Sequence, residues 1–425
     1  MSDPEPSPGT SAAAGAVNAP PHAPDPAYGW VMVAAVFVLS ALSFGALGSV
    51  SVFLKPLSAE FGWTRAETAL GYTTISFASA LFGILWGIVA DRYGTRWFGL
   101  AAATAMTLCL CLLSQQQSIV QFYAFYFLFG AFGNAMVSAP LFANVGFWFR
   151  NNPGLALGIT ASGGAFGQGL VPYIVGRVIT DQGWESAYLW MAGCYFIIAL
   201  PFALLIRESP WRQQVRLQNS PPAKDFPLSD WQVVIWISGA IIFCCNCMAV
   251  PIVHLVPLLT DRGHSLEFAT GTLMVLMFCG VAGRIMGGKL GDSIGALPGY
   301  MIMSLGQTIS VFWFTQVNST AGLYALAAFF GFTYSGVMSS ILVCTRMMVS
   351  ANFGGRAMAI TSFFGWTGMG LGGFFGGLFY DIHGNYSLSF GFAAMMGVIN
   401  LIILSAFYLR IQRARQDLIP AGALG

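Results

Sequence analysis

Charged residues are scarce in this sequence. They make up 8% of the 425 residues, and the 18 Lys and Arg nearly balance the 16 Asp and Glu, whereas soluble domains carry about 25% charged residues. This scarcity excludes an ordinary soluble enzyme, and the near-zero net charge offers no basic face for nucleic acid. With 56% hydrophobic residues and a mean hydropathy of +0.70, many apolar side chains must face lipid. The sequence therefore predicts an integral membrane protein.

Catalytic and metal-binding motifs are also missing. No glycine-rich phosphate loop follows a strand pattern and no nucleophile elbow is present, so we predict neither an enzyme nor a cofactor. All eight cysteines lie in apolar runs, which favours packing over disulfides. The densest group is Cys244-Cys245-Asn246-Cys247. Its three thiols point in different directions on a helix and no second cluster completes a tetrahedron, so we predict no metal site.

Long runs without charge divide the chain into helices. They cover 29–54, 68–90, 97–149, 151–176, 186–206, 231–260, 293–345, 357–380 and 382–409. Because a bilayer core takes about 20 helical residues, the two longest runs hold two spans each. One more span at 266–291 completes an all-α integral membrane fold of twelve transmembrane helices.

The spans fall into two groups of six. We expect a disordered Pro- and Ala-rich tail over 1–27, which lacks the basic start of a cleavable signal peptide. A six-helix bundle over 28–206, a polar cytoplasmic linker over 207–229 and a second six-helix bundle over 230–409 follow, with a cytoplasmic tail over 410–425.

Basic residues gather on one side of the predicted membrane. If the N-terminus is cytoplasmic, 13 of the 18 Lys and Arg lie in inner loops and tails. The outer loops hold four, Lys55, Arg65, Arg177 and Arg262, and Arg284 lies within the membrane. The positive-inside rule therefore places both termini in the cytoplasm.

The two halves of the chain repeat each other at a constant shift of 201 residues. The matched pairs include Trp30 and Trp231, Pro56 and Pro257, Gly62 and Gly263, Thr64 and Ser265, Gly94 and Gly295, Gly130 and Gly331, and Thr160 and Thr361. Two related six-helix bundles are typical of transporters that bind their substrate at the midplane between the halves. Glycines crowd the fifth and eleventh helices, which suits either a rocking interface or static close packing.

A short motif marks the cytoplasmic end of the second helix. It reads Gly87-Ile-Val-Ala-Asp91-Arg92-Tyr-Gly94-Thr-Arg96, and the second half keeps Gly288, Asp292 and Gly295. Glycine allows close helix contact, the aspartate accepts hydrogen bonds at the membrane boundary, and the arginines donate to neighbouring helix ends. The motif resembles the signature loop of the major facilitator superfamily, which implies a gating role for these residues and for Asp292. A topology anchor without a gating role is the alternative.

Arg284 is the strongest candidate for a binding residue. It lies in the eighth predicted helix, about 12 Å of helical rise inside Asp292. A charge at that depth costs about 2.5–3.5 kcal/mol on insertion scales. No Asp or Glu lies mid-membrane in another span, so a substrate carboxylate is the expected counter-charge. The alternative is an arginine that extends to the cytoplasmic headgroups.

Other polar side chains in the spans are weaker candidates. His254 follows Pro251 and precedes Pro257, two prolines that predict a discontinuous helix, and its imidazole is suited to bind substrate or carry a coupling proton. Packing as a neutral structural histidine is the alternative. The remaining substrate-binding candidates are Asn134, Ser138, Tyr334 and Asn246. Interhelical hydrogen bonds account for such residues equally well.

Four stretches give the chain a closer resemblance. They are Tyr28-Gly29-Trp30, Ser49-Val-Ser-Val-Phe-Leu-Lys55, the His254 segment, and Gly280-Val-Ala-Gly-Arg284-Ile-Met-Gly-Gly288. Through them, residues 28–409 resemble monocarboxylate-transporter-type members of the major facilitator superfamily, close to bacterial lactate/pyruvate and oxalate–formate relatives. The resemblance implies that Arg284 binds the substrate carboxylate. Gly48 and Gly280 stand where animal members carry a lysine and an aspartate, and Gly365 stands near the second lysine of the oxalate transporter, so monoanions are favoured and the proton carrier stays open.

The sequence thus predicts a secondary active transporter that carries a small monocarboxylate such as lactate or pyruvate in symport with a proton and works by alternating access. Its expected partners are the carboxylate, a proton and the lipid bilayer, with the monomer as the working unit. The expected location is the cell membrane, in the inner membrane of a bacterium. An exchanger of organic anions and an efflux carrier of amphiphilic drugs are the alternatives. A sensor or scaffold would need a sizeable soluble part, and the longest candidate is the 27-residue tail.

Overall fold

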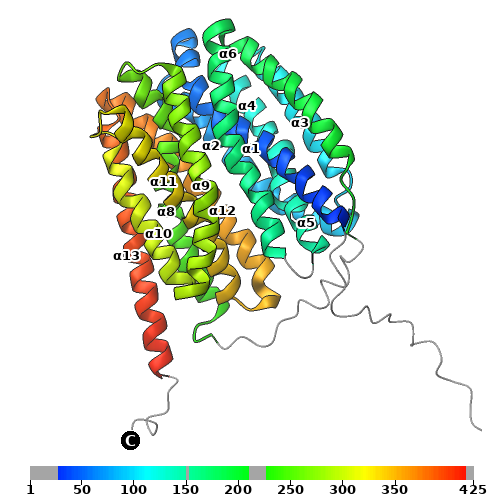
Figure 1. The fold of residues 1–425 in the computed structure, drawn as a ribbon, viewed down its shortest axis with the longest axis vertical. Coiled ribbons are helices and arrows are strands. Elements are labelled where there is room, and N and C mark those ends of the chain that lie inside the picture. The colour runs from blue at the N-terminus through cyan, green and yellow to red at the C-terminus, as the bar shows by residue number, and fades with distance from the viewer. Residues whose placement is uncertain (1–26, 150–152, 210–225, 418–425) are drawn as a thin grey trace, which may run out of the picture.

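The computed structural model describes residues 27–149, 153–209 and 226–417, and this part of the chain is helical with short connections (Figure 1). Residues 1–26 of the tail expected over 1–27, and the central part of the linker, lie outside the described residues. The first three helices are α1 (Ala27–Phe61), α2 (Arg65–Tyr93) and α3 (Phe98–Leu113). A capping box of Thr64 and Glu67 starts α2.

The next helix is irregular. It runs without a loop through α4 (Ile119–Leu128), the π-helical segments η1 (Phe129–Asn134) and η2 (Val137–Leu141), and α5 (Phe142–Trp148). Pro140 lies inside η2, where its ring cannot donate a backbone hydrogen bond. The wider turns leave carbonyls available to neighbours, and the indole of Trp86 donates to the Ala131 carbonyl at 2.7 Å. The sequence did not indicate these π-helical turns.

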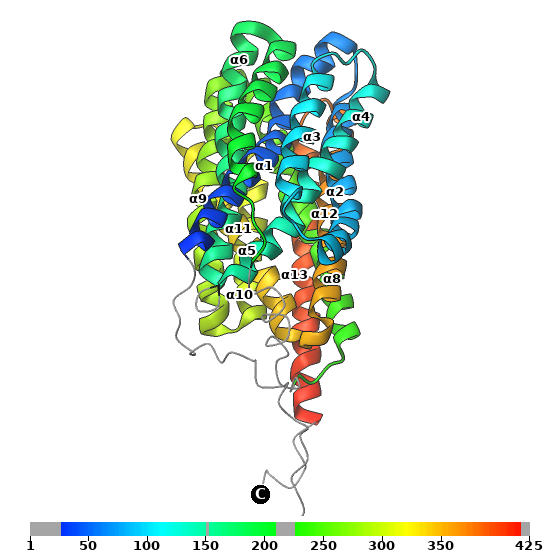
Figure 2. The ribbon, with the colours of Figure 1, turned by 90° about the vertical axis from the view of Figure 1, so that its right-hand side faces the viewer.

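The remaining helices are long. They are α6 (Pro153–Leu204), α8 (Asp230–Asp261), α9 (Leu266–Ile294), α10 (Ala296–Trp313), α11 (Thr320–Met348), α12 (Ala351–His383) and α13 (Ser387–Asp417). Gly183, with φ of 84°, joins two helices within α6. The end of α13 projects beyond the other helices (Figures 1 and 2) and continues as far as Asp417, into the segment expected to be a tail.

The expected break in the helix around His254 is wrong. The structure has one helix, α8, that passes through both Pro251 and Pro257. Each proline removes only one backbone N–H from the ladder, and neighbouring helices cover α8 on most sides, so the helix persists.

Several helices have the length and composition of a membrane span. Seven described helices meet this criterion: Ala27–Phe61, Arg65–Ala90, Leu155–Leu204, Asp230–Asp261, Leu266–Gly291, Thr320–Thr345 and Ser387–Gln416. Phe98–Leu113 and Ile119–Asn134 are shorter apolar helices.

Backbone geometry reproduces the 201-residue repeat. All residues with positive φ in the described ranges are glycines. They form three pairs at that shift: Gly62 with Gly263, Gly94 with Gly295, and Gly183 with Gly384. Only glycine adopts this conformation without strain, so the same three turns recur in each half.

Glycines allow close helix contacts both within each half and between the halves. Within each half, Gly167 of α6 abuts the Ala41 carbonyl of α1, and Gly368 of α12 abuts the Ile242 carbonyl of α8. Across the halves, Gly377 of α12 approaches the backbone of Ala66 in α2, and Gly169 of α6 approaches Met277 in α9. The glycine faces therefore serve static packing within each half as well as the seams between the halves.

Candidate functional site

Arg284 lies at the seam between the halves. From α9, its Nη1 donates to the backbone carbonyl of Ala161 in α6 at 2.7 Å. Its Nε is buried without a hydrogen-bond partner. None of the ion pairs among the described residues includes Arg284. The guanidinium is thus held by a neutral carbonyl, which leaves its charge without an acidic partner in the described part of the protein.

Two buried tyrosines, one from each half, interact with each other, and one of them, Tyr334, also interacts with Arg284. Tyr334 of α11 is 4% exposed, and its phenol interacts electrostatically with Arg284. Tyr72 of α2 is fully buried, its hydroxyl has no hydrogen-bond partner, and it interacts electrostatically with Tyr334. The structure thus brings the predicted pair Arg284 and Tyr334 together. It adds Tyr72, which the sequence did not single out because a lone tyrosine in an apolar run carries no distinguishing signal.

His254 lies apart from this group. It is fully buried in α8, and its Nε2 lies 2.7 Å from the Gly373 carbonyl of α12. Its Nδ1 has no hydrogen-bond partner, and the ring lies 5.4 Å from that of Tyr386. His254 links two helices of the second half, and no described contact joins it to Arg284.

The other polar candidates contact their own half. Asn134 is fully buried and bonds to side chains of α1 and α2. The Nδ2 of Asn246 donates to the Ile242 carbonyl in its own helix at 2.9 Å, and its Oδ1 is unpartnered. Ser138 is partly buried in η2. These contacts resemble interhelical and helix-internal packing more than an open binding site.

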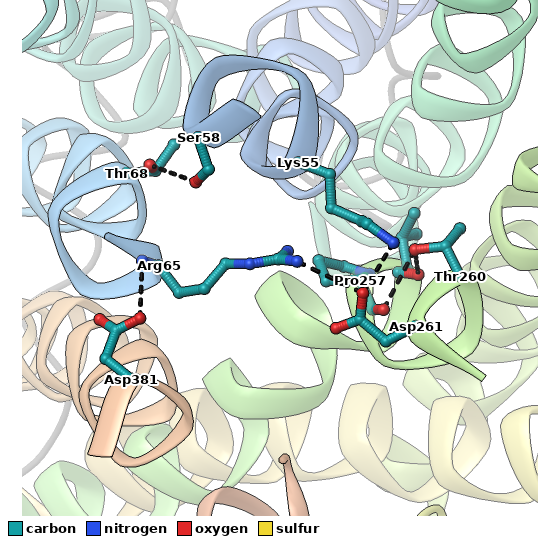
Figure 3. Close-up of polar contacts among 9 residues, drawn as sticks. Lys55, Ser58, Arg65, Thr68, Pro257, Thr260, Asp261 and Asp381 are labelled. Carbon is teal, nitrogen blue, oxygen red and sulfur yellow. Dashed lines mark hydrogen bonds and ion pairs between the residues drawn. The ribbon is translucent and has the colours of Figure 1, made fainter. Parts of the chain in front are cut away.

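Ion pairs join the halves at the side predicted to face outward. Asp261 at the end of α8 accepts from Lys55 Nζ at 2.7 Å and from Arg65 Nη2 at 3.3 Å (Figure 3). Arg177 of α6 pairs with Glu267 of α9. Each of these ion pairs joins one half to the other.

A second aspartate holds the start of α2. Figure 3 shows Asp381 of α12 next to Arg65, whose backbone N–H donates to its carboxylate at 2.9 Å. The N–H of Ala66 donates to the same carboxylate at 2.7 Å. A carboxylate at a helix N-terminus satisfies free donors and complements the helix dipole. We call Lys55, Arg65, Asp261 and Asp381 the outer seam.

The predicted gating motif lies at the other end of α2. Arg92 and Arg96 are exposed, and each guanidinium lies over the ring of the next residue, Tyr93 and Trp97. Gly94 ends α2 with φ of 88°, and the hydroxyl of Thr95 donates to Glu208 at 2.7 Å. The side chains of Asp91 and Asp292 lie outside the described part of the structure.

The close helix contact expected at Gly87 is absent. A Cβ added at Gly87, or at its repeat partner Gly288, would meet no described atom within 4 Å. Neighbouring helices do not approach these glycines in this conformation, so their gating role stays a prediction.

Comparison with known proteins identifies the family. A family model described as Major Facilitator Superfamily matches residues 36–344 and 235–423. The chain belongs to this superfamily. As a member it is a multi-pass membrane transporter of small substrates and not an enzyme.

Curated relatives place the chain among proteins like the monocarboxylate transporters. Monocarboxylate transporter 13 of Bos taurus is 24% identical over 375 residues, which cover 86% of each chain. Monocarboxylate transporter 4 of Mus musculus is 26% identical over 335 residues, 74% of this chain and 69% of the mouse protein. The MFS-type transporter hasB of Aspergillus fumigatus is 27% identical over 333 residues, 73% of this chain and 72% of hasB.

A solved structure shares the fold. A bacterial homolog to the human lysosomal transporter Spinster, in an inward-facing and occupied conformation, superposes with a TM-score of 0.71. The match covers 91% of this chain and 97% of that chain at 16% sequence identity. At this identity the likeness concerns the fold alone.

Proposed function

We propose that this superfamily member is a secondary active transporter of a small monocarboxylate, with twelve transmembrane helices in two six-helix bundles related by a pseudo-two-fold axis. The three glycine turns that recur at a shift of 201 residues support the two related halves. The monocarboxylate transporters among the relatives support the substrate class. The working unit is a monomer in the cell membrane, proposed to be a bacterial inner membrane, with both termini in the cytoplasm.

Arg284 is the proposed carboxylate-binding residue. Its charge lacks an acidic partner among the described residues and lies where the halves meet, which is the observation that carries the proposal. A substrate carboxylate replaces the Ala161 carbonyl as the acceptor and offers two oxygens to the planar guanidinium. Binding thereby cancels the charge and releases a bond between the halves, which favours the change of state. Tyr334, whose phenol interacts with the guanidinium, is the residue proposed to orient the ligand, and Tyr72 interacts with Tyr334.

The outer seam supports an inward-facing state. Asp261 and Asp381 join the halves on the side proposed to face outward, as expected for a transporter that is closed on that side. Alternating access then requires the outer seam to open and the cytoplasmic ends, including the Gly87 motif, to close. His254 remains the proposed carrier of a coupled proton.

Substitution of Arg284 tests the proposal. Arg284→Ala should abolish lactate uptake into proteoliposomes, whereas Arg284→Lys should retain a small part of it because the charge stays and the fork geometry is lost. Lys289→Ala is the matched control, since Lys289 is an exposed cation five positions further along the same helix. Uptake by the alanine variant at the wild-type rate would reject the proposed role.

Competition separates the proposed substrate class from its alternatives. Lactate and pyruvate should compete with labelled lactate, and lipophilic cations should not. Oxalate should compete poorly, because a dianion would leave one carboxylate without a cation near Gly365. Strong competition by oxalate would favour an organic-anion exchanger, and competition by lipophilic cations would favour a drug carrier.

A further inference from the structure

The first half contains a closed network of polar side chains. Asn134 of η1 accepts a hydrogen bond from Ser43 Oγ of α1 at 2.7 Å. Its Nδ2 donates to Ser79 Oγ of α2 at 2.9 Å. Three helices are thereby tied by side chains that satisfy one another, which is how buried polar groups usually stabilise a fold.

The corresponding residues of the second half do not form this hydrogen-bond network. At the shift of 201 residues, Ser43, Asn134 and Ser79 correspond to Cys244, Ser335 and Gly280. The Cys244 sulfur accepts from Gln307 Nε2 of α10 at 3.3 Å, so it is engaged elsewhere. Gly280 has no side chain, and Ser335 Oγ is fully buried without a hydrogen-bond partner among the described residues.

Gly280 makes room for that hydroxyl. A Cβ at Gly280 would collide with Ser335 Oγ, so a serine like that of the first half does not fit here while the Ser335 side chain keeps this orientation. A buried hydroxyl without a partner is unfavourable, and such groups are rare in native structures unless they serve a function.

The open hydroxyl and the proposed carboxylate-binding residue lie on two helices in contact, α11 and α9. Gly280 is one helical turn, about 6 Å, from Arg284 on the same face of α9. Ser335 directly follows Tyr334, whose phenol interacts with the Arg284 guanidinium. Ser335 Oγ, which lies against Gly280, is therefore about one helical turn along α9 from Arg284, and both residues have an unpartnered buried polar atom.

We propose that Ser335 recognises the oxygen on C2 of a 2-hydroxy or 2-oxo monocarboxylate whose carboxylate is held by Arg284. This inference rests on the proposed function of Arg284. The hydroxyl donates to a 2-oxo oxygen or exchanges a hydrogen bond with a 2-hydroxyl group. Asn134 is thus structural in the first half, whereas its repeat partner Ser335 determines substrate specificity in the second half.

The test compares two acids of similar size that differ at C2. Uptake of lactate and of propionate is measured in proteoliposomes with the wild-type chain and with Ser335→Ala. The variant should raise the apparent KM for lactate about tenfold, the effect of one lost hydrogen bond, and leave that for propionate unchanged. Equal changes for both acids, or no change for lactate, would overturn the proposal.

A matched variant controls for packing on α11. Ser340 Oγ donates to the Gly336 carbonyl of its own helix at 2.9 Å, so Ser340→Ala should leave the lactate-to-propionate ratio as in the wild type. A changed ratio in this control would count against the assignment to Ser335. If Arg284→Ala still transports lactate, the proposed function itself fails. If Arg284 is essential and Ser335→Ala keeps the wild-type ratio, only the role of Ser335 fails.

Discussion

At the scale of single residues, buried polar groups in the membrane helices are of two kinds. Asn134 has its partners within the protein, and its side chain joins three segments of the first half. Arg284, Tyr72 and Ser335 retain buried polar atoms without a hydrogen bond to any described residue, and the charge and phenol interactions place Tyr72 and Arg284 around Tyr334. Groups of the first kind stabilise the fold, whereas Arg284 and Ser335 of the second kind are the proposed contacts of the ligand.

Asn134→Ala therefore should affect stability more than transport. The substitution leaves Ser43 Oγ without its acceptor and removes a donor to Ser79, a cost of about 1–3 kcal/mol. Thermal unfolding in detergent should show a lower midpoint than the wild type, while the apparent KM for lactate stays the same. Ser138→Ala, one turn further along, is the control with an unchanged midpoint. A raised apparent KM for lactate at an unchanged unfolding midpoint would instead indicate that Asn134 binds the substrate.

Arg284 could be singled out from the sequence, whereas the partners of Asn134 could not. An arginine far inside an apolar run is conspicuous, because its insertion cost must be offset by a partner, a ligand or an escape to the headgroups. Ser43 and Ser79 lie 91 and 55 residues from Asn134, and serines are common in such helices, so nothing in the chain marks them as partners. For the same reason the contrast between Asn134 and Ser335 became visible only when both sets of contacts were known.

At the scale of helices, the outer seam is built on a helix start. Thr64 and Glu67 cap α2 from within the first half. Asp381 of the second half receives the next two backbone N–H groups, and Gly377 allows the close approach because it lacks a Cβ. The N-terminus of α2 is therefore satisfied only while the halves touch on this side.

Asp381→Asn should weaken the outer seam. An amide keeps an acceptor but loses the charge that complements the helix N-terminus, an effect of about 0.3–1 kcal/mol. That corresponds to a shift of the conformational equilibrium by a factor of roughly two to five toward opening on the outer side. Spin labels at exposed Ala59 and Ile382 should report a larger population of long distances by pulsed electron resonance.

Glu60→Gln is the matched control for this prediction. Glu60 lies at the same end of the molecule but accepts from the Trp184 indole of its own half. The label distances should therefore stay as in the wild type. An equal shift in both variants would point to a general effect of charge rather than to the outer seam.

The helices were predictable from apolar runs, but their irregularities and seams were not. The prolines of α8 pointed to a break that the structure does not have, because surrounding helices stabilise the continuous helix. The bonds from Arg65 and Ala66 to Asp381 join residues 316 and 315 positions apart in the sequence, so only the folded chain reveals them.

At the scale of the whole molecule, substrate and proton have separate requirements. Arg284 and a bound monocarboxylate together carry no net charge. The halves can therefore change conformation around the occupied site without an unpaired charge inside the membrane. A coupled proton needs another carrier, because the substrate neutralises Arg284 and none of the ion pairs among the described residues offers Arg284 an acidic partner. His254, buried between α8 and α12 with Nδ1 free of hydrogen bonds to the described residues, is the proposed carrier.

His254→Gln should uncouple transport from the pH gradient. In proteoliposomes that hold wild-type protein, an acidic outer medium should accelerate lactate uptake several-fold. The glutamine variant should lose this acceleration yet keep lactate–lactate exchange, because an amide still meets the Gly373 carbonyl but does not titrate at these pH values. His383→Gln is the control, since His383 is exposed at the end of α12. Acceleration that persists in the His254 variant would assign the proton to another path. A wild-type protein that ignores the gradient and still exchanges lactate would instead be an anion exchanger, in which the charge-cancelled Arg284 alone drives the crossing.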